Sequence, residues 1–396
     1  MRGTVGFPAS IVSSPEERPA MSLTLRTVSR EQHLAYIQSL PSASHCQVPA
    51  WADVKNEWRS ESLGWFDERT GEMVGAGLVL YRQLPKVKRY LAYLPEGPVI
   101  NWYAPNLDEW LRPMLDHLKQ HGAFSVKMGP PVVIRRWDAA AIKKGIQDQD
   151  VKRLRDIEAT HIEPRAFEVA DKLRRMGWQQ GEDGGAGFGD VQPRYVFQVP
   201  LEGRSLEDVH KSFNQLWRRN IKKADKAGVQ VVQGDMANPY DLDEWQRLYE
   251  ITAERDRFRP RPKAYFQRMW NVLNAEDPQR MRLYFAEHEG ERISAATMLV
   301  VGGHVWYSYG ASANHKREVR PSNAMQWRML QDAYALGASV YDLRGISDSL
   351  DENDHLFGLI QFKVGTGGQA AEYLGEWDFP LNKLLHKALD MYMSRR

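Results

Sequence analysis

Polar and apolar residues along this chain alternate in short runs that predict strands, separated by stretches with helical spacing. Two strand-like stretches resemble each other. "FDERTGEMVGAGLVLY", from Phe66, and "FAEHEGERISAATMLV", from Phe285, share five residues at one offset, and each predicts a hairpin with a glycine in its turn. Further on, "HGAFSVKMG" and "LGASVYDLRG" each predict a helix that ends near Gly122 or Gly337, followed by a short strand. The repeat predicts two copies of one α/β unit.

Residues 205–228 predict one helix, with Ser205 as its N-cap and Gly228 just beyond its end. The apolar stripe consists of Val209, Phe213, Leu216, Trp217, Ile221 and Ala224. The opposite side carries Lys211, Arg218, Arg219, Lys222, Lys223 and Lys226. Such a charged face is usually just solvated. The alternative is that it contacts a polyphosphate or an RNA backbone.

The stretch "ERDRFRPRPKAYF" favours that second alternative. Pro260 and Pro262 prevent a continuous helix and hold this segment extended. Arginines on a stiffened segment lose less entropy on binding and contact phosphate with two parallel hydrogen bonds. We therefore regard Arg257, Arg259 and Arg261 as candidates for contacting phosphate.

Composition and motifs exclude several classes of protein. A net charge of +2 does not by itself indicate a nucleic-acid binder. The one cysteine, Cys46, excludes an intramolecular disulfide and a cysteine-based metal site. His-Glu-x-x-His, Gly-x-Ser-x-Gly and Walker motifs are absent, and the eleven histidines show no ligand spacing, so we expect neither a metal nor a cofactor. No apolar run suits a membrane span or signal peptide, and we expect a cytoplasmic monomer.

Two segments of the chain are rich in small residues. Residues 1–20 predict a disordered tail, and either Met1 or Met21 could be the start. The glycines of "GEDGGAGFGDVQPRY", residues 181–195, lead to a proline and a strand. A dinucleotide-binding turn would lead to a helix, so we interpret this segment as a flexible loop between domains.

The stretch "VWYSYGASANHKREVRPSNAMQW" predicts an aromatic strand, a loop, and a helix that begins near Pro321. The same order holds pyrophosphate in acyl-CoA acetyltransferases of the Gcn5-related superfamily (GNAT). Those enzymes need glycines in the turn so that backbone N–H groups can approach the phosphates. Residues 317–321 contain no glycine, so the turn that binds CoA is absent.

Five stretches together resemble the Fem family of aminoacyl-tRNA-dependent peptidyltransferases (FemABX-like), over residues 24–380. They are "WADVK", "RRNIKKADKAGV", "RFRPRPKAYF", "WYSYGAS…R…P…YDLRG" and "GLIQFKVGTGGQAAEYLGEWD". The resemblance implies an α/β (α+β) fold of two tandem acetyltransferase-like domains. We expect the first at 21–190, completed by 359–396, and the second at 191–358. The helical-hairpin arm of some relatives is missing.

The resemblance also implies roles for individual residues. Lys363, with Phe362 beside it, is the expected catalytic residue, whose ammonium would stabilise the tetrahedral oxyanion. We read "LIQFKV" as a strand, which places Gln361 and Lys363 opposite its apolar face, toward a cleft. Lys55 and Arg261 would hold the phosphates of the acceptor, and Tyr265 with Tyr307 or Tyr309 would line its site. Candidate contacts to tRNA or phosphate are Arg218, Arg219, Lys222, Arg257 and Arg259.

The chain departs from the family at one position, because Gly129 in "VKMGPPV" stands where relatives often carry an acid. The implied reaction transfers Gly, Ala or Ser, with Gly favoured, from aminoacyl-tRNA to the stem peptide of lipid II or UDP-MurNAc-pentapeptide. The amphipathic segment "PLNKLLHKALDMYMSRR" could contact the inner membrane face or pack on the core. Two alternatives are an acyl-CoA N-acyltransferase and a non-catalytic precursor- or RNA-binding module.

Overall fold

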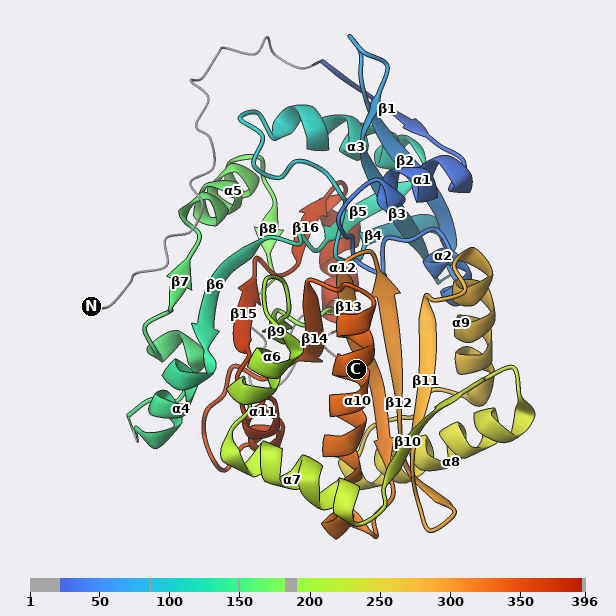
Figure 1. Ribbon diagram of the computed structural model, residues 1–396. Coiled ribbons are helices and arrows are strands. Elements are labelled where there is room, and N and C mark those ends of the chain that lie inside the picture. Colours follow the sequence, from blue (N-terminus) through green and yellow to red (C-terminus); the bar gives the residue numbers. More distant parts are fainter. Residues whose placement is uncertain (1–21, 86, 149, 182–190, 394–396) are drawn as a thin grey trace.

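The computed structural model of the chain describes residues 22–85, 87–148, 150–181 and 191–393, whose strands form two sheets (Figure 1). The predicted tail at 1–20 and most of the predicted loop, 182–190, lie outside the described residues. The first sheet has the order β1 (Leu23–Thr27), β2 (Arg59–Asp67), β3 (Met73–Leu84), β4 (Val87–Leu94), β5 (Ala123–Met128), β16 (Trp377–Pro380) and β8 (Gln179–Gln180). The second has the order β10 (Gln230–Gly234), β11 (Met281–His288), β12 (Glu291–Val301), β13 (His304–Ser312), β14 (Val340–Gly345), β9 (Tyr195–Pro200), β15 (Gln369–Tyr373), β6 (Val133–Asp138) and β7 (His161–Ile162).

The predicted repeat is confirmed. Strands β2 and β3, and likewise β11 and β12, form antiparallel hairpins. Their turns contain Gly71 at φ +72° and Gly290 at φ +78°, a conformation that favours glycine. In each copy the next strand, β4 or β13, pairs in parallel with β5 or β14, which follows helix α3 (Asp108–Gln120) or α10 (Pro321–Ala335). The chain is therefore two copies of one α/β unit.

The two sheets do not follow the predicted domain boundaries at residues 190 and 359, because each side of these boundaries contributes strands to both sheets. Strand β16 joins the first sheet, whereas β15 pairs with β9 and β6 in the second. Helix α11 (Phe357–Val364) also packs on the core of the second sheet, and β6 and β7 extend that sheet from the first half of the chain. Where the domain boundaries lie stays a prediction.

Helices cover both faces of the second sheet, and alternate residues of β11 show which helix covers which face. Leu283 and Phe285 join a core with α8 (Pro239–Asp256) and α9 (Lys263–Glu276). Tyr284 and Ala286 join a separate core with α7 (Gln215–Lys226) and α10. We call these the α9 face and the α7 face. The α9 face also packs against Leu80 of β3, so its core joins the two sheets.

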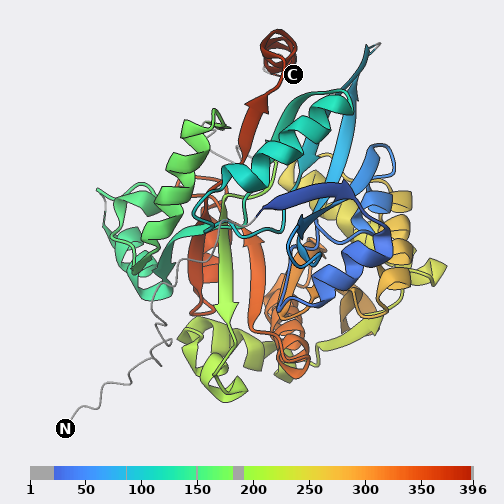
Figure 2. The same ribbon diagram turned by 90° about the horizontal axis from the view of Figure 1, so that it is seen from above.

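Further helices complete the fold. They are α1 (Arg30–Gln38), α2 (Trp51–Val54), α4 (Ala139–Gln147), α5 (Pro164–Arg175), α6 (Leu206–Ser212) and α12 (Lys383–Met393). Helix α12, red in Figure 2, projects from one end of the molecule. Strand β10 alone separates α7 from α8, so the described residues contain no long helical arm, as predicted. None of the described helices combines the length and apolar character that crossing a membrane requires.

The single helix predicted over 205–228 is wrong, because it is broken into α6 and α7. Phe213 has an extended backbone, and Asn214 caps α7 by accepting a hydrogen bond from the backbone N–H of Trp217 at 2.8 Å. An Asn side chain that bonds nearby backbone favours a new helix start over continuation. Arg218 then donates to the carbonyl oxygens of Lys211 and Phe213 at the end of α6.

The loop after α11 packs closely on α6, and substituting Gly367 in this loop tests the contact. Gly367 has φ +72°, and a Cβ there would lie 2.1 Å from the carbonyl oxygen of Ser212. Gly290 has a similar φ of +78° but no atom within 4 Å of such a Cβ. We expect Gly290→Ala to cost about 1 kcal/mol from backbone strain alone, and Gly367→Ala about 1–3 kcal/mol more. Urea denaturation measures both, and equal losses would contradict the packing of this loop.

Candidate active-site cleft

A cavity of about 320 Å³ opens on the α9 face and brings together four of the predicted site residues. They are Lys55, Arg261, Tyr265 and Tyr309. The Lys55 ammonium, just after α2, lies 3.4 Å from the Tyr265 hydroxyl, and the Arg261 guanidinium lies 4.5 Å from the centre of the Tyr265 ring. Burial, together with the charge of Arg261, lowers the pKa of Lys55. Two neighbouring cations on an aromatic wall suit a phosphate ligand.

A β-bulge decides which tyrosine of β13 faces this cavity. Thr297 pairs with Tyr309 and Met298 with Tyr307, which leaves Ser308 as an extra residue. The extra residue turns Tyr307 and Tyr309 to opposite sides of the sheet. Tyr307 therefore packs into the core of the α7 face, whereas Tyr309 lies 3.5 Å from the Tyr265 hydroxyl. Regular alternation would have placed both tyrosines on one side.

A second cavity, of about 280 Å³, adjoins the first, since Gln192, Pro193 and Arg344 line both. Arg344 donates hydrogen bonds to Glu96 at 2.9 Å and to Gln192 at 3.1 Å. Arg344 and Glu96 both have a left-handed backbone, at φ +63° and +48°. Burial would raise the pKa of Glu96, but the Arg344 guanidinium and His45 hold it below its ordinary value. Paired, left-handed non-glycine residues are typical of functional sites.

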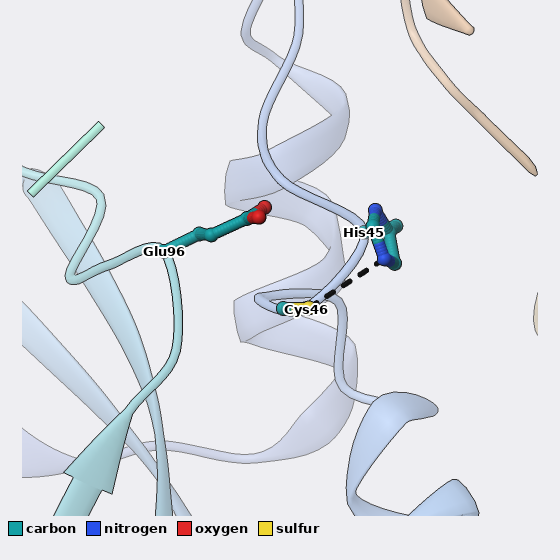
Figure 3. Close-up of side chains that lie close together, drawn as sticks. All are labelled: His45, Cys46 and Glu96. Atoms are coloured by element: carbon teal, nitrogen blue, oxygen red, sulfur yellow. Dashed lines mark hydrogen bonds between the residues drawn. The ribbon is translucent and has the colours of Figure 1, made fainter. Parts of the chain in front are cut away.

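The partly buried Glu96 and the buried His45 and Cys46 form a group whose possible ligand atoms lie within 4.8 Å of one another (Figure 3). Glu96 points toward the contact between His45 Nε2 and Cys46 Sγ, which are 3.5 Å apart. Although these are zinc-ligand types, Glu96 already binds the Arg344 guanidinium, and burial raises the pKa of the Cys46 thiol. Burial also lowers the pKa of His45 to about 3. Because the Arg344 guanidinium already pairs with Glu96 and the Cys46 thiol is neutral, we interpret this group as part of the packing and not as a metal site.

The prediction that the histidines show no ligand spacing is wrong for one pair. His117 and His121 lie one helical turn apart at the end of α3, and their rings stack at 4.1 Å. Glu61 of β2 lies 3.1 Å from His117 Nε2 and completes a second group of possible ligands. The i, i+4 spacing was the signal that sequence reasoning missed.

Lys363 does not take the position predicted for it. Residues 357–364 form α11, in which Ile360, Lys363 and Val364 are buried on one face at helical spacing. Lys363 is 4% exposed and lines neither cavity. Its ammonium donates to the carbonyl oxygen of Gly345 at 2.7 Å and lies 3.4 Å from that of Arg344. The ammonium therefore lies on the α7 face and contacts the backbone at Arg344, a residue that lines the second cavity on the other side.

Phe362 and the basic residues of α7 share that face. The Phe362 ring lies 4.7 Å from the Trp217 ring, and its carbonyl oxygen accepts a hydrogen bond from the Trp217 indole at 2.8 Å. Arg219 and Lys222 are exposed on α7. Arg257 and Arg259, also exposed, follow α8 and so belong to the opposite α9 face. The predicted phosphate contacts thus divide into two groups on opposite faces.

The comparisons with known proteins agree with this geometry. The model of the FemAB family matches residues 28–277 and 275–393. The chain belongs to the FemAB family. Its relatives include lipid II:glycine glycyltransferases of Staphylococcus epidermidis and Staphylococcus aureus, each 23% identical over 93% of this chain and 95% of theirs.

Solved structures of relatives support the same fold. The crystal structure of FemX superposes with a TM-score of 0.76 at 21% identity, over 92% of this chain and 99% of that one. A tandem GNAT protein from the clavulanic acid biosynthesis pathway has a TM-score of 0.50 at 11% identity, over 91% and 99%. The predicted fold of two tandem GNAT-like units is confirmed, and as a FemAB-family protein the chain is an aminoacyltransferase.

In this FemAB-family chain the C-terminal apolar stripe is only partly described. Leu381 packs against the core of the first sheet, and His386 lies 2.9 Å from Ser125 of β5. Leu384 is 83% exposed. The side chains of Ala388, Leu389 and Tyr392 lie outside the described residues. Contact with a membrane stays a prediction.

The buried ammonium of Lys363 makes the stability of the fold depend on pH. Burial lowers the pKa of Lys363 to about 7, against about 10.4 in an unfolded chain. Between these values the unfolded chain binds more protons, so this group's contribution to the free energy of unfolding rises with pH. We expect Lys363→Met to be at least as stable as the wild type at pH ~7 and to lack this rise. Urea denaturation at about pH 7 and pH 10 measures both; parallel pH profiles would show that the ammonium is not buried.

Proposed function

We propose that this chain transfers glycine from glycyl-tRNA to an amino group of the stem peptide of a peptidoglycan precursor, lipid II or UDP-MurNAc-pentapeptide. The names of its relatives support the donor amino acid and the class of acceptor. The observation that carries the proposal is a split in the second sheet. Strands β13 and β14 pair from His304–Val340 to Trp306–Asp342 and no further, and the Lys363 ammonium ends beside Arg344 and Gly345, just past the last pair.

The two substrates approach this split from opposite faces. Lys55 and Arg261 on the α9 face bind the phosphates of the acceptor, and Tyr265 and Tyr309 line its path. The stem peptide continues past Arg344 into the second cavity. The exposed cations of α7, Arg219 and Lys222, bind the tRNA backbone on the α7 face. The glycyl ester then enters the split beside Lys363.

Lys363 supplies positive charge where the oxyanion forms. The acceptor amine attacks the ester carbonyl, and the resulting oxygen replaces the carbonyl oxygen of Gly345 as the acceptor from the ammonium. Charge stabilisation that exists only in the transition state raises kcat. Because burial lowers the pKa of Lys363 to about 7, the ammonium is lost as pH rises above that value, and kcat should fall there.

Transfer assays test the reaction. Purified protein receives tRNA charged with radiolabelled glycine, alanine or serine, together with lipid II or UDP-MurNAc-pentapeptide. We expect RNase-sensitive labelling of an acceptor from glycyl-tRNA, with kcat lowered at least about 100-fold by Lys363→Met and the KM for acceptor little changed. Labelling from an acyl-CoA donor and none from tRNA would overturn the proposal. Binding of acceptor without transfer from either donor would indicate a non-catalytic module.

Separate variants on the two faces test the approach of the substrates. Lys55→Ala and Arg261→Ala each remove one cation from the acceptor side, whereas Arg219→Ala and Lys222→Ala remove one from α7. We expect the first pair to raise the KM for acceptor about 10-fold and leave the KM for glycyl-tRNA unchanged, because a charged hydrogen bond contributes about 1.5–3 kcal/mol. The second pair should raise only the KM for tRNA, and more strongly at low salt. Variants of both faces acting on one substrate would contradict the division.

A further inference from the structure

The acceptor amine must lose a proton, and most ionisable groups around the second cavity are already engaged. Gly129, which lines it, has no side chain to offer. Glu96 binds Arg344 and Ser44. Glu376 accepts hydrogen bonds from the Tyr93 hydroxyl at 2.5 Å and from the backbone N–H of Val191 at 3.0 Å. A carboxylate held by donors is a weak base.

His304, at the start of β13, is different. It lines the second cavity, and its Nε2 lies 3.1 Å from Asp342 Oδ2. Its ring stacks on Trp306 at 4.0 Å with 9° between the planes, which fixes the orientation of the imidazole. Among the described residues, no hydrogen-bond partner is found for its Nδ1. With a proton on Nε2 facing the carboxylate, Nδ1 keeps its lone pair.

Asp342 is itself held in place. It is 1% exposed and receives hydrogen bonds from the Gln198 amide at 2.9 Å and the Arg344 backbone N–H at 2.6 Å. Burial would raise the pKa of Asp342, but His304 and Arg344 keep it below its ordinary value. An ionised carboxylate that orients an imidazole and stabilises the imidazolium is the arrangement of a catalytic dyad.

We propose that His304, oriented by Asp342, is the general base that takes the proton from the acceptor amine. The inference rests on the proposed function. As the amine nitrogen forms a bond to the ester carbon, its proton passes to His304 Nδ1. When the tetrahedral intermediate collapses, the C–O bond to the tRNA ribose breaks, and His304 returns the proton to the ribose oxygen. The proton that the amine loses is thus the one that the ribose oxygen gains, and the electron pair of the broken C–O bond stays on that oxygen.

Other charged groups surround the dyad. Arg344 lies two residues after Asp342 on β14. Glu96, on the loop after β4, offsets Arg344 by pairing with it. His45 lies near His304, since the rings of both pack against Trp306, and Lys363 interacts with Asp342 from behind.

The test uses His304→Gln, in the full chain, with the radiolabelled glycyl-tRNA assay. The glutamine amide can still donate to Asp342 but provides no base in place of Nδ1. We expect kcat to fall at least about 100-fold and the KM for acceptor to change less than about 3-fold. Imidazole added to His304→Ala should restore part of the activity. His355→Gln, which changes an exposed histidine outside both cavities, serves as the matched control.

The outcomes separate this inference from the proposed function. Transfer by the wild type together with an unchanged kcat in His304→Gln would overturn the role of His304 and leave the reaction intact. A large rise in the KM for acceptor with normal kcat would assign His304 to binding and also overturn the inference. Absence of transfer by the wild type would overturn both. Thermal unfolding of His304→Gln near the wild-type temperature shows that lost activity is not lost fold.

Discussion

The ion pair between Glu96 and Arg344, whose side chains are each 20% exposed, joins the two sheets, and the shape of the cleft depends on it. Such a pair adds little net stability, but removing one partner leaves the other charge partly buried without its counterion. The pair therefore matters more for the position of Arg344 than for the stability of the fold. Because Arg344 is held from Glu96, its backbone N–H reaches Asp342 and its carbonyl oxygen faces Lys363. The wall shared by both cavities is set by one contact across the sheets.

The two copies of the α/β unit differ in how far their parallel strands pair. Strands β4 and β5 pair from Tyr90–Ala123 through Leu94–Met128, so the first sheet stays closed. Strands β13 and β14 lose their pairing after Trp306 and Asp342. A left-handed Arg344 directs the chain away from the parallel register at that point. The same scaffold occurs twice, and in the second copy the Lys363 ammonium reaches the carbonyl oxygens of Arg344 and Gly345 just past the end of the β13–β14 pairing.

How far the sequence could be interpreted depended on whether a local signal was unambiguous. The repeat was predicted because turn glycines and strand alternation agree in both copies. The short apolar run at 359–364 lacks a period that separates helix from strand, so Lys363 was recognised by its motif but misplaced in space. The bulge at Ser308 arises where β13 pairs with β12, and the break at Asn214 arises from capping of α7. Neither the orientation of Tyr309 nor the His304–Asp342 contact could be found without the sheet register.

The surroundings of Gly129 limit where this cleft can hold a further ionisable group. A Cβ on Gly129 would lie 3.3 Å from the backbone nitrogen of Glu96 and 3.7 Å from Cγ of Glu376. An acid there would add a third carboxyl group to a cavity that Glu96 and Glu376 already line, and like charges disfavour this. On β13, by contrast, the proposed base His304 lies beside Asp342 and adds no negative charge to the cavity. The negative charge of Glu96 and Glu376 thus agrees with a base on the second copy of the unit, as we propose.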